Sequence, residues 1–327
     1  MAILITGVAG FIGSSVALRL ISNGKKIIGV DNLNDYYDVD LKKNRLKRLK
    51  NIELFIFYLL DIVDRTAIEK LFSENKIDTV IHFAAQPGVR YSVTHPHAYV
   101  DANLIGFVNI LEACRQHKIK HFVFASSSSV YGGNTKLPFV ETDPTDQPLS
   151  LYGATKKANE LMAYSYAHAY QLPCTGLRFF TVYGPWGRPD MAVFSFTRNI
   201  LGEKTITVFN NGNMLRDFTY IDDVVSGVIK IINMMPANYK IYNIGNSRPV
   251  KLHYFIEVLE NTLQKKAKLN MQPAYAVDAP NTYADVSSFE KGVGVLPHTS
   301  IEAGIAKFAA WYRDYYGVQQ CVQSPVL

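Results

Sequence analysis

The chain has 327 residues, a hydrophobic content of 48%, a formal net charge of +6 and a pI of about 9.0. It is long enough for one large α/β domain or for a nucleotide-binding domain with a smaller second one, and it has no run of 18 apolar residues, which excludes a transmembrane helix. Its first residues read as a strand and lack the features of a signal peptide, so we expect a cytoplasmic protein without membrane association.

The basic charge suits either nucleic acid or a polyanionic small substrate. The one dense basic run covers residues 42–48, and its helical spacing predicts the solvated face of a surface helix. No RNA-binding motif or zinc-finger spacing accompanies it, so we expect no nucleic-acid partner and no metal. The three cysteines, Cys114, Cys174 and Cys321, lack metal-ligand spacing and are predicted to be reduced thiols.

The first predicted elements are a buried strand over residues 2–5 and a helix over 11–22, joined by a glycine-rich turn. Gly7, Gly10 and Gly13 have the spacing that permits a tight turn, close approach of the backbone to a pyrophosphate and close packing of helix on strand. A second strand over 26–30 ends in Asp31, whose carboxylate can accept both adenosine ribose hydroxyls and would repel a 2′-phosphate. This combination predicts a dinucleotide site that binds NAD rather than NADP.

Strands and helices then alternate, which predicts a Rossmann-type, doubly wound parallel sheet. Further strands are expected at 53–58, 79–84, 121–126 and 174–179, and further helices at 40–49, 64–74, 99–117 and 151–170. After Tyr183, clusters of Gly, Pro and Asn predict a smaller C-terminal α/β substrate lobe. We expect residues 1–180 to form the dinucleotide-binding domain, with 220–244 returning to it, and residues 181–219 and 245–327 to form the substrate lobe.

The next informative pattern pairs a serine cluster with a tyrosine and a lysine. Residues 126–129 are all serine and end a predicted strand, at the edge where doubly wound folds bind ligands. Tyr152 and Lys156 open the following helix and lie four residues apart, so they project from one face. A neighbouring ammonium lowers the pKa of a phenol, which makes Tyr152 a candidate general base.

With these residues in place, the chain resembles the extended short-chain dehydrogenase/reductases, and among them the UDP-glucuronate 4-epimerases. The resemblance runs from residue 1 to about 316 and is carried by four further segments, at 31–38, 84–92, 178–192 and 216–223. Pro87 departs from the family pattern, which has a small residue such as alanine there, and residues 292–296 are less regular than the pattern.

The resemblance implies roles for individual residues. It makes Ser127, Tyr152 and Lys156 catalytic, with Lys156 also holding the nicotinamide ribose. It places NAD against Gly7, Gly10, Phe11, Ile12, Gly13, Asp31, Asn32, Asp61, Ile62, Phe83, Ala84, Ala85, Asn103, Tyr152, Lys156 and Phe179. It places the UDP-sugar against Arg90, Ser127, Ser128, Ser129, Tyr152, Thr181, Arg188, Val208, Arg216 and Asp285. Two positions keep an alternative, because Asp61 could cap the helix over 64–74 and Arg216 could pair with Asp222 or Asp223.

The implied activity is NAD-dependent epimerisation of UDP-glucuronate to UDP-galacturonate through a 4-keto sugar, in a homodimer formed by the helices over 99–117 and 151–170. Such an isomerase would supply polysaccharide biosynthesis. A 4-epimerase of UDP-glucose or UDP-N-acetylglucosamine is the main alternative. A dehydratase would carry Asp-Glu after the catalytic hydroxyl, where this chain has Ser128-Ser129, and a catalytically silent regulator would have lost Tyr152 or Lys156.

Overall fold

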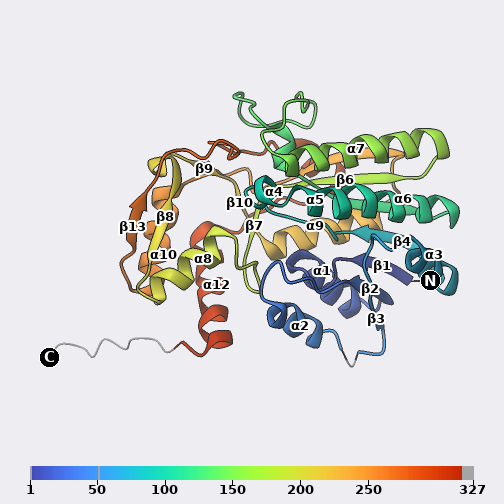
Figure 1. The fold of residues 1–327 in the computed structure, drawn as a ribbon, viewed down its shortest axis with the longest axis horizontal. Coiled ribbons are helices and arrows are strands. Elements are labelled where there is room, and N and C mark those ends of the chain that lie inside the picture. The colour runs from blue at the N-terminus through green and yellow to red at the C-terminus, as the bar shows by residue number, and fades with distance from the viewer. Residues whose placement is uncertain (1, 51, 319–327) are drawn as a thin grey trace.

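The computed structural model describes residues 2–50 and 52–318, and Cys321 lies outside them. Its centre is a seven-stranded, wholly parallel sheet in the order β11-β6-β5-β4-β1-β2-β3 (Figure 1). The strands are β1 (Ala2–Thr6), β2 (Ile27–Asp31), β3 (Phe55–Leu59), β4 (Ile77–His82), β5 (His121–Ser127), β6 (Cys174–Phe179) and β11 (Tyr239–Ile244). The predicted doubly wound Rossmann-type fold is confirmed.

Helices cover both faces of this sheet, as Figure 1 shows. One face carries α1 (Phe11–Ser22) and α9 (Ile221–Asn233), with α2 (Val39–Lys47) beside α1 and α11 (Ser287–Val293) beside α9. The other carries α3 (Arg65–Glu74), α6 (Gly106–Gln116) and α7 (Leu151–Tyr170). Successive strand residues such as Leu4 and Ile5 belong to two separate apolar clusters. The strands therefore read as continuous apolar runs, because both of their faces are buried.

The remaining elements lie over the carboxyl ends of the strands and beside them. Three small sheets pair β7 (Thr181–Tyr183) with β10 (Phe218–Tyr220), β8 (Thr205–Val208) with β13 (Lys268–Met271), and β9 (Leu215–Arg216) with β12 (Val250–Lys251). Three helices accompany them, namely α8 (Ala192–Leu201), α10 (Leu252–Leu263) and α12 (Ile301–Tyr316). Short helical turns follow β5 at Ser128–Tyr131 and β8 at Phe209–Gly212.

Two predicted helices differ from the structure. The helix expected over 99–117 is divided into α5 (Pro96–Val100), a π-helical turn over Asp101–Ile105 and α6, with α4 (Tyr91–Thr94) just before them. The prediction that residues 42–48 form a solvated basic face is wrong for Lys42 and Arg45, which are 5% and 0% exposed. Both side chains turn under the helix toward polar groups of neighbouring loops, a tertiary effect that charge spacing does not encode.

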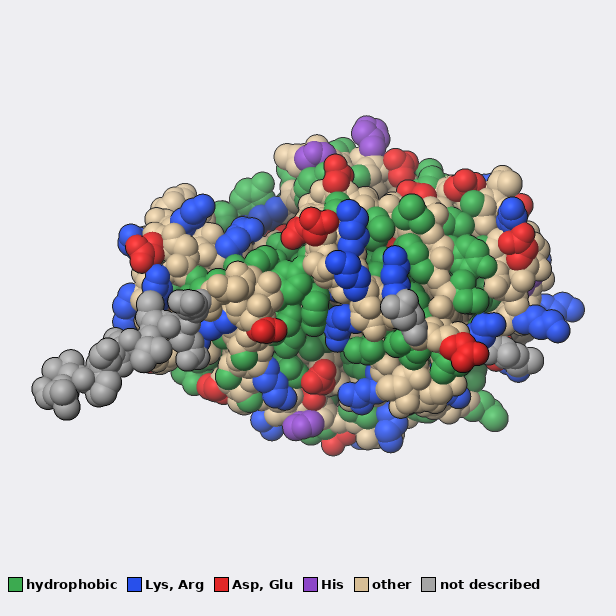
Figure 2. Space-filling model, turned by 90° about the horizontal axis from the view of Figure 1, so that it is seen from below, with side chains coloured by type: hydrophobic (Ala, Val, Ile, Leu, Met, Phe, Trp, Pro, Cys, Tyr) green, Lys and Arg blue, Asp and Glu red, His purple; other side chains and the backbone are tan. Residues whose placement is uncertain are grey.

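The surface itself shows no single dominant charge on the face drawn in Figure 2. There, lysine and arginine side chains are spread among acidic and hydrophobic ones. Cys114 and Cys174 are free and buried. None of the helices within the described ranges is sufficiently long and apolar to cross a bilayer.

Candidate active site

A cavity of about 1010 Å³ lies where the carboxyl ends of the central strands meet the small sheets and their helices. Its sheet side is lined by the glycine turn after β1, by Asp31 at the end of β2 and by the serine cluster at the end of β5. Its other side is lined by residues that follow β7 in the chain, among them Arg216 and Asp278. Ligands of doubly wound folds bind at this edge, because the connections diverge there and leave a crevice.

The glycine turn is required by close backbone packing. Gly7 has φ +71°, and a Cβ placed there would lie 2.6 Å from the amide nitrogen of Ala84. A Cβ at Gly13 would lie 2.2 Å from the carbonyl oxygen of Gly7. Below the turn, the Thr6 hydroxyl accepts from the Ala84 amide at 3.2 Å and shares a 2.8 Å hydrogen bond with Nδ1 of His82. The turn leads into α1 without a side-chain cap, so the first amides of the helix are open to a ligand.

Two carboxylates border the turn. Asp31 accepts the amides of Ala9 and Leu33 at 3.0 and 2.9 Å, and burial raises the pKa of its carboxyl group. Asp61 accepts the Val63 amide at 2.9 Å and the Asn32 side-chain amide at 2.9 Å. The alternative that Asp61 caps α3 is wrong, because Asp64 is the N-cap and accepts the Ala67 amide.

The three predicted catalytic residues all line the cavity. Ser127 ends β5 in an extended conformation, and its Oγ accepts the Ser129 amide at 3.2 Å. Lys156 donates from Nζ to the carbonyl oxygen of Ala125 at 2.9 Å, and burial lowers the pKa of its ammonium to about 8. Tyr152 lies one turn earlier on α7, in the first turn after the Ser150 N-cap, so helix geometry brings it to the serine cluster.

The sequence predicts that the Lys156 ammonium lowers the pKa of Tyr152, but in the structure a different cation has this effect. Burial raises the pKa of the Tyr152 phenol, while the charge of Arg188 and a hydrogen bond from Ser127 lower it. Arg188 is therefore the cation that stabilises the phenolate in this structure. It is held by Asp190, with Nε–Oδ1 and Nη2–Oδ2 distances of 3.0 and 2.8 Å, and Asp190 also accepts the Tyr36 hydroxyl at 3.1 Å.

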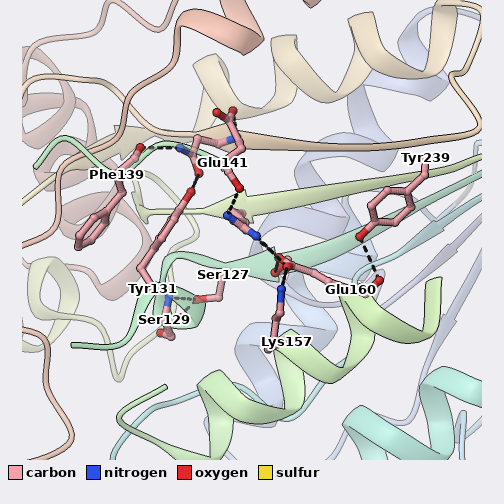
Figure 3. Close-up of polar contacts among 11 residues, drawn as sticks. Ser127, Ser129, Tyr131, Phe139, Glu141, Lys157, Glu160 and Tyr239 are labelled. Atoms are coloured by element: carbon pink, nitrogen blue, oxygen red, sulfur yellow. Dashed lines mark hydrogen bonds and ion pairs between the residues drawn. The ribbon is translucent and has the colours of Figure 1, made fainter. Parts of the chain in front are cut away.

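A buried ion pair links α7, the helix of Tyr152, to β6, the strand beside that of Ser127 (Figure 3). Glu160, two turns beyond Tyr152 on α7, accepts from Nε and Nη2 of Arg178 at 2.8 and 2.9 Å and from the Ser126 hydroxyl at 2.7 Å. The side chains of Arg178 and Glu160 are 3% and 2% exposed. The ion pair fixes α7 against β6, and the Ser126 hydrogen bond fixes it against β5, on the helix and strand that carry the predicted catalytic residues.

Three arginines from distant segments line the cavity, namely Arg188, described above, Arg90 and Arg216. Arg90 pairs with Asp278 and lies 3.8 Å over the ring of Phe209. Arg216 donates to the carbonyl oxygens of Leu215 and Pro280 at 2.9 and 2.8 Å, and burial lowers the pKa of its guanidinium to about 10. Within the described residues no carboxylate forms an ion pair with it, so the proposed pairing with Asp222 or Asp223 is wrong. A partly buried guanidinium that has no ion-paired carboxylate among the described residues, and on which Asp278 acts only at longer range, is suited to a phosphate group.

Most of the predicted site residues converge on the cavity, and three do not. The cavity is lined by Gly7, Gly10, Phe11, Ile12, Gly13, Asp31, Asn32, Asp61, Ile62, Phe83, Ala84, Ala85, Arg90, Ser127, Ser128, Ser129, Tyr152, Lys156, Phe179, Thr181, Arg188 and Arg216. Asn103 is buried behind it and acts on the chain instead, accepting the Gln86 amide at 2.7 Å. Val208 is buried in β8 between the lining residues Thr207 and Phe209. Asp285 caps the turn before α11 by accepting the Ser287 amide.

Sequence reasoning also missed residues that the cavity contains. Lys42 lines it and donates from Nζ to Oδ1 of Asn34 at 2.6 Å. Asp190 and Asp278 line it as the partners of Arg188 and Arg90. Segment 31–38 is one of those that carry the family resemblance, but its local pattern does not predict that Lys42 folds back toward it. Nor does any local pattern predict that Asp278 pairs with Arg90 across the cavity.

The cofactor side of the cavity fits a dinucleotide. Added Cβ atoms would collide with backbone at the glycines of the turn, so the close packing of α1 on β1 requires glycine there. The amides of Gly7 and Val8 donate to the Val30 carbonyl, so the donors left for a ligand are the first amides of α1. The Asp31 carboxylate lies at the end of the neighbouring strand and lines the same space. The residues present therefore match the donors and acceptors that NAD requires.

Comparisons with known proteins agree with this site. UDP-glucuronate 4-epimerase 2 of Arabidopsis thaliana is 46% identical over 334 residues, which cover 97% of this chain and 76% of the plant protein. The crystal structure of the Bacillus cereus UDP-glucuronic acid 4-epimerase with UDP-glucuronic acid and NAD matches with a TM-score of 0.91 at 33% identity, covering 97% of this chain and 100% of that one.

A third protein has the same fold with a neutral sugar. The UDP-glucose 4-epimerase of Thermotoga maritima, solved with UDP-glucose, matches with a TM-score of 0.89 at 30% identity, covering 97% of this chain and 100% of that one. The NAD dependent epimerase/dehydratase family matches residues 3–245, which is more than half of the chain. The chain is therefore a member of the NAD dependent epimerase/dehydratase family.

Proposed function

We propose that this protein is an NAD-dependent isomerase that converts UDP-glucuronate to UDP-galacturonate. The observation that carries the proposal is that the glycine turn, the Ser127–Tyr152 pair and Arg216 all line one cavity. The glycine turn accounts for the cofactor, Arg216 for the UDP pyrophosphate and the tyrosine for proton transfer. The 46% identity to a plant UDP-glucuronate 4-epimerase supports the choice of sugar.

Proton transfer is assigned to Tyr152. When bound, NAD supplies the acceptor and the donor for the hydride at C4 of the sugar. Tyr152 takes the proton of the 4-hydroxyl during oxidation and returns it during reduction, and Ser127 orients that hydroxyl. Arg188 and Ser127 offset part of the burial that raises the pKa of Tyr152, so they favour the phenolate needed for this role.

The substrate carboxylate poses a chemical problem. Oxidation at C4 of a uronic acid makes a β-keto acid, which loses CO₂ readily. We assign the inner contacts to hydroxyl donors of Ser127, Ser128, Ser129 and Thr181, because hydroxyls bind a carboxylate without neutralising it. Arg188 and Arg90 already have carboxylate partners, Asp190 and Asp278, which supports leaving the substrate carboxylate to the hydroxyls. We assign Arg188 separately to closing over the UDP.

One experiment distinguishes this function from a neutral-sugar epimerase. Purified protein is incubated with UDP-glucuronate and no added cofactor, and the products are followed by NMR. UDP-galacturonate should appear, since the cofactor is expected to remain bound and to be regenerated in each cycle. Conversion of UDP-glucose or UDP-N-acetylglucosamine in parallel reactions, with UDP-glucuronate unchanged, would contradict the proposal.

The identity of the cofactor has its own test. We assign selection of NAD over NADP to Asp31, whose carboxylate lines the cavity at the end of β2 and would repel a 2′-phosphate. Mass analysis of the nucleotide released by denaturation should find NAD⁺ or NADH. Mostly NADP(H) would contradict this assignment.

We also propose that residues 1–180 with 220–244 form the cofactor domain and that residues 181–219 and 245–327 form the substrate lobe. We further propose that the protein is cytoplasmic, serves polysaccharide biosynthesis and forms a homodimer. The dimer proposal rests on exposed apolar side chains of the α6 and α7 layer, among them Ile105 at 44% and Leu161 at 59% exposed. Light scattering at micromolar concentration should give the mass of two chains, and a monomer would contradict it.

A further inference from the structure

Arg45 of α2 is a buried arginine with an unusual set of partners. Its side chain has no exposed surface. All five of its N–H donors are used by oxygen acceptors that carry no full charge. Nε and Nη2 donate to the carbonyl oxygen of Trp186 at 3.0 and 2.6 Å, Nη2 also donates to that of Gly187 at 3.0 Å, and Nη1 donates to the Ala9 carbonyl at 3.1 Å and the Tyr37 hydroxyl at 2.6 Å.

Burial of such a group is costly. Removing a guanidinium from water costs several kcal/mol, and a carboxylate partner normally offsets part of that cost. No carboxylate in the described part of the chain lies within ion-pair distance of Arg45, although its charge acts at longer range on Asp31. A buried, unpaired arginine does not stabilise its own surface helix. Its hydrogen bonds are useful only if they hold together the loops that they join.

The joined loops belong to the two halves of the cavity. Ala9 directly precedes Gly10 of the glycine turn, and Gly187 directly precedes Arg188. The segment at Trp186 has a left-handed backbone, with φ +66° at Trp186, a conformation that is strained for a large side chain. That segment therefore depends on contacts from outside itself, and the fork of Arg45 supplies three hydrogen bonds to it.

We propose that Arg45 is a positioning residue that couples the dinucleotide turn to the Trp186–Arg188 segment. The coupling fixes the position of Arg188, on the substrate side of the cavity, relative to the cofactor side. Its planar fork is what the role requires, because a lysine ammonium keeps the charge but cannot reach carbonyls of two separate loops with fixed geometry. The substrate side of this inference rests on the proposed function.

The coupling predicts a specific effect on Tyr152. The charged and titratable groups that face it are Arg188 and Asp190 from the 184–191 segment, Tyr99 from α5 and, one turn along α7, Lys156. Arg188 is the cation that lowers the pKa of Tyr152, so displacing its segment should raise that pKa. A base with a higher pKa is protonated up to a higher pH, and the acid limb of kcat/KM should move in that direction.

The test compares Arg45→Lys with the wild type and with Lys43→Ala, a control on the exposed side of the same helix. In Arg45→Lys, the acid limb of kcat/KM for UDP-glucuronate should move up by about 0.5–1 pH unit. The Kd of UDP, measured by calorimetry, should rise about tenfold, while the NAD content after purification stays near that of the wild type. Lys43→Ala should leave all three unchanged.

A second variant separates charge from geometry. Arg45→Met removes the charge near Asp31 as well as the fork, so it should lose bound NAD in addition to showing the UDP effect. If Arg45→Lys keeps the wild-type pH profile and UDP affinity, the coupling is refuted. It is also refuted if circular dichroism shows that Arg45→Lys does not fold, because Arg45 would then stabilise the whole fold rather than position one segment. The UDP and NAD measurements do not depend on the sugar, so a wild type inactive on UDP-glucuronate would refute the proposed function alone.

Discussion

The two halves of the cavity are built in different ways. The cofactor half, comprising the glycine turn, Asp31 and Asp61, is made of backbone amides and short side chains that bond to residues two to about thirty positions away. The substrate half, comprising Arg90, Arg188 and Arg216, is made of long cationic side chains. Arg90 reaches Asp278, which is 188 residues further along the chain.

This difference has a physical origin. A pyrophosphate and a ribose are bound well by helix amides and one carboxylate, which a continuous strand–turn–helix can supply. A sugar that must turn between two faces needs contacts that can change partner, and solvent-reachable arginine–carboxylate pairs can exchange more easily than a packed backbone. Single substitutions in the cofactor half should therefore abolish NAD binding, whereas single substitutions in the substrate half should only weaken substrate binding or turnover.

The largest effect is expected from Gly13→Ala. The added Cβ would lie 2.2 Å from the Gly7 carbonyl oxygen, so the turn must open and the phosphate amides must move. The variant should be purified without NAD, be inactive, and lose about 1–3 kcal/mol of stability. Gly133→Ala is the matched control, since its nearest neighbour is a side-chain atom 3.6 Å away. Retention of NAD by a folded Gly13→Ala protein would contradict this view of the cofactor half.

Tyr152→Phe tests the residue on which both halves converge. Removal of the phenol removes the proton path but no backbone contact, so NAD should stay bound while kcat falls at least ~10²-fold. The measurement is the initial rate of UDP-galacturonate formation, with NAD content as the check of integrity. Turnover near the wild-type rate would show that another group serves as the base.

Smaller losses are expected when single hydroxyls that we assign to the substrate carboxylate are removed. Thr181→Ala or Ser128→Ala should release UDP-pentose as a by-product or weaken UDP-glucuronate binding by ~1–3 kcal/mol, the cost of an unpaired charged acceptor. Product NMR and calorimetry with UDP-glucuronate measure the two outcomes. Normal epimerisation without pentose in both variants would refute the hydroxyl assignment and leave the arginines to hold the carboxylate.

The smallest expected effect is a loss of folding stability at mildly acidic pH. Burial lowers the pKa of His82, which lies beneath the glycine turn, from 6.5 to about 3. The unfolded chain therefore binds more protons between these values, so stability is lost as pH falls through the window, by ~1 kcal/mol between pH 6.5 and 5.5. Urea unfolding across this range should show a weaker pH dependence in His82→Asn than in the wild type. His97→Asn, which alters an exposed histidine, should keep the wild-type dependence.

Much of the fold and of the cofactor half was predictable because it is locally encoded. Apolar runs and glycine spacing identify the strands and the turn, and the i, i+4 relation of Tyr152 and Lys156 follows from helix geometry alone. The resemblance identified the family, which the match over residues 3–245 confirms. The individual contacts of NAD and UDP stay predictions.

Only the tertiary structure decided how charges are partnered. Basic residues in helical spacing predict a solvated face, yet Arg45 is buried because carbonyls of two separate segments and the Tyr37 hydroxyl point at one place. Asn103 and Asp285 have the right chemistry for ligand contacts but are satisfied by nearby amides, Gln86 and Ser287. The sequence determines backbone geometry through short-range sterics, whereas the partner of a long charged side chain depends on which distant loop folding brings within a few ångströms of it.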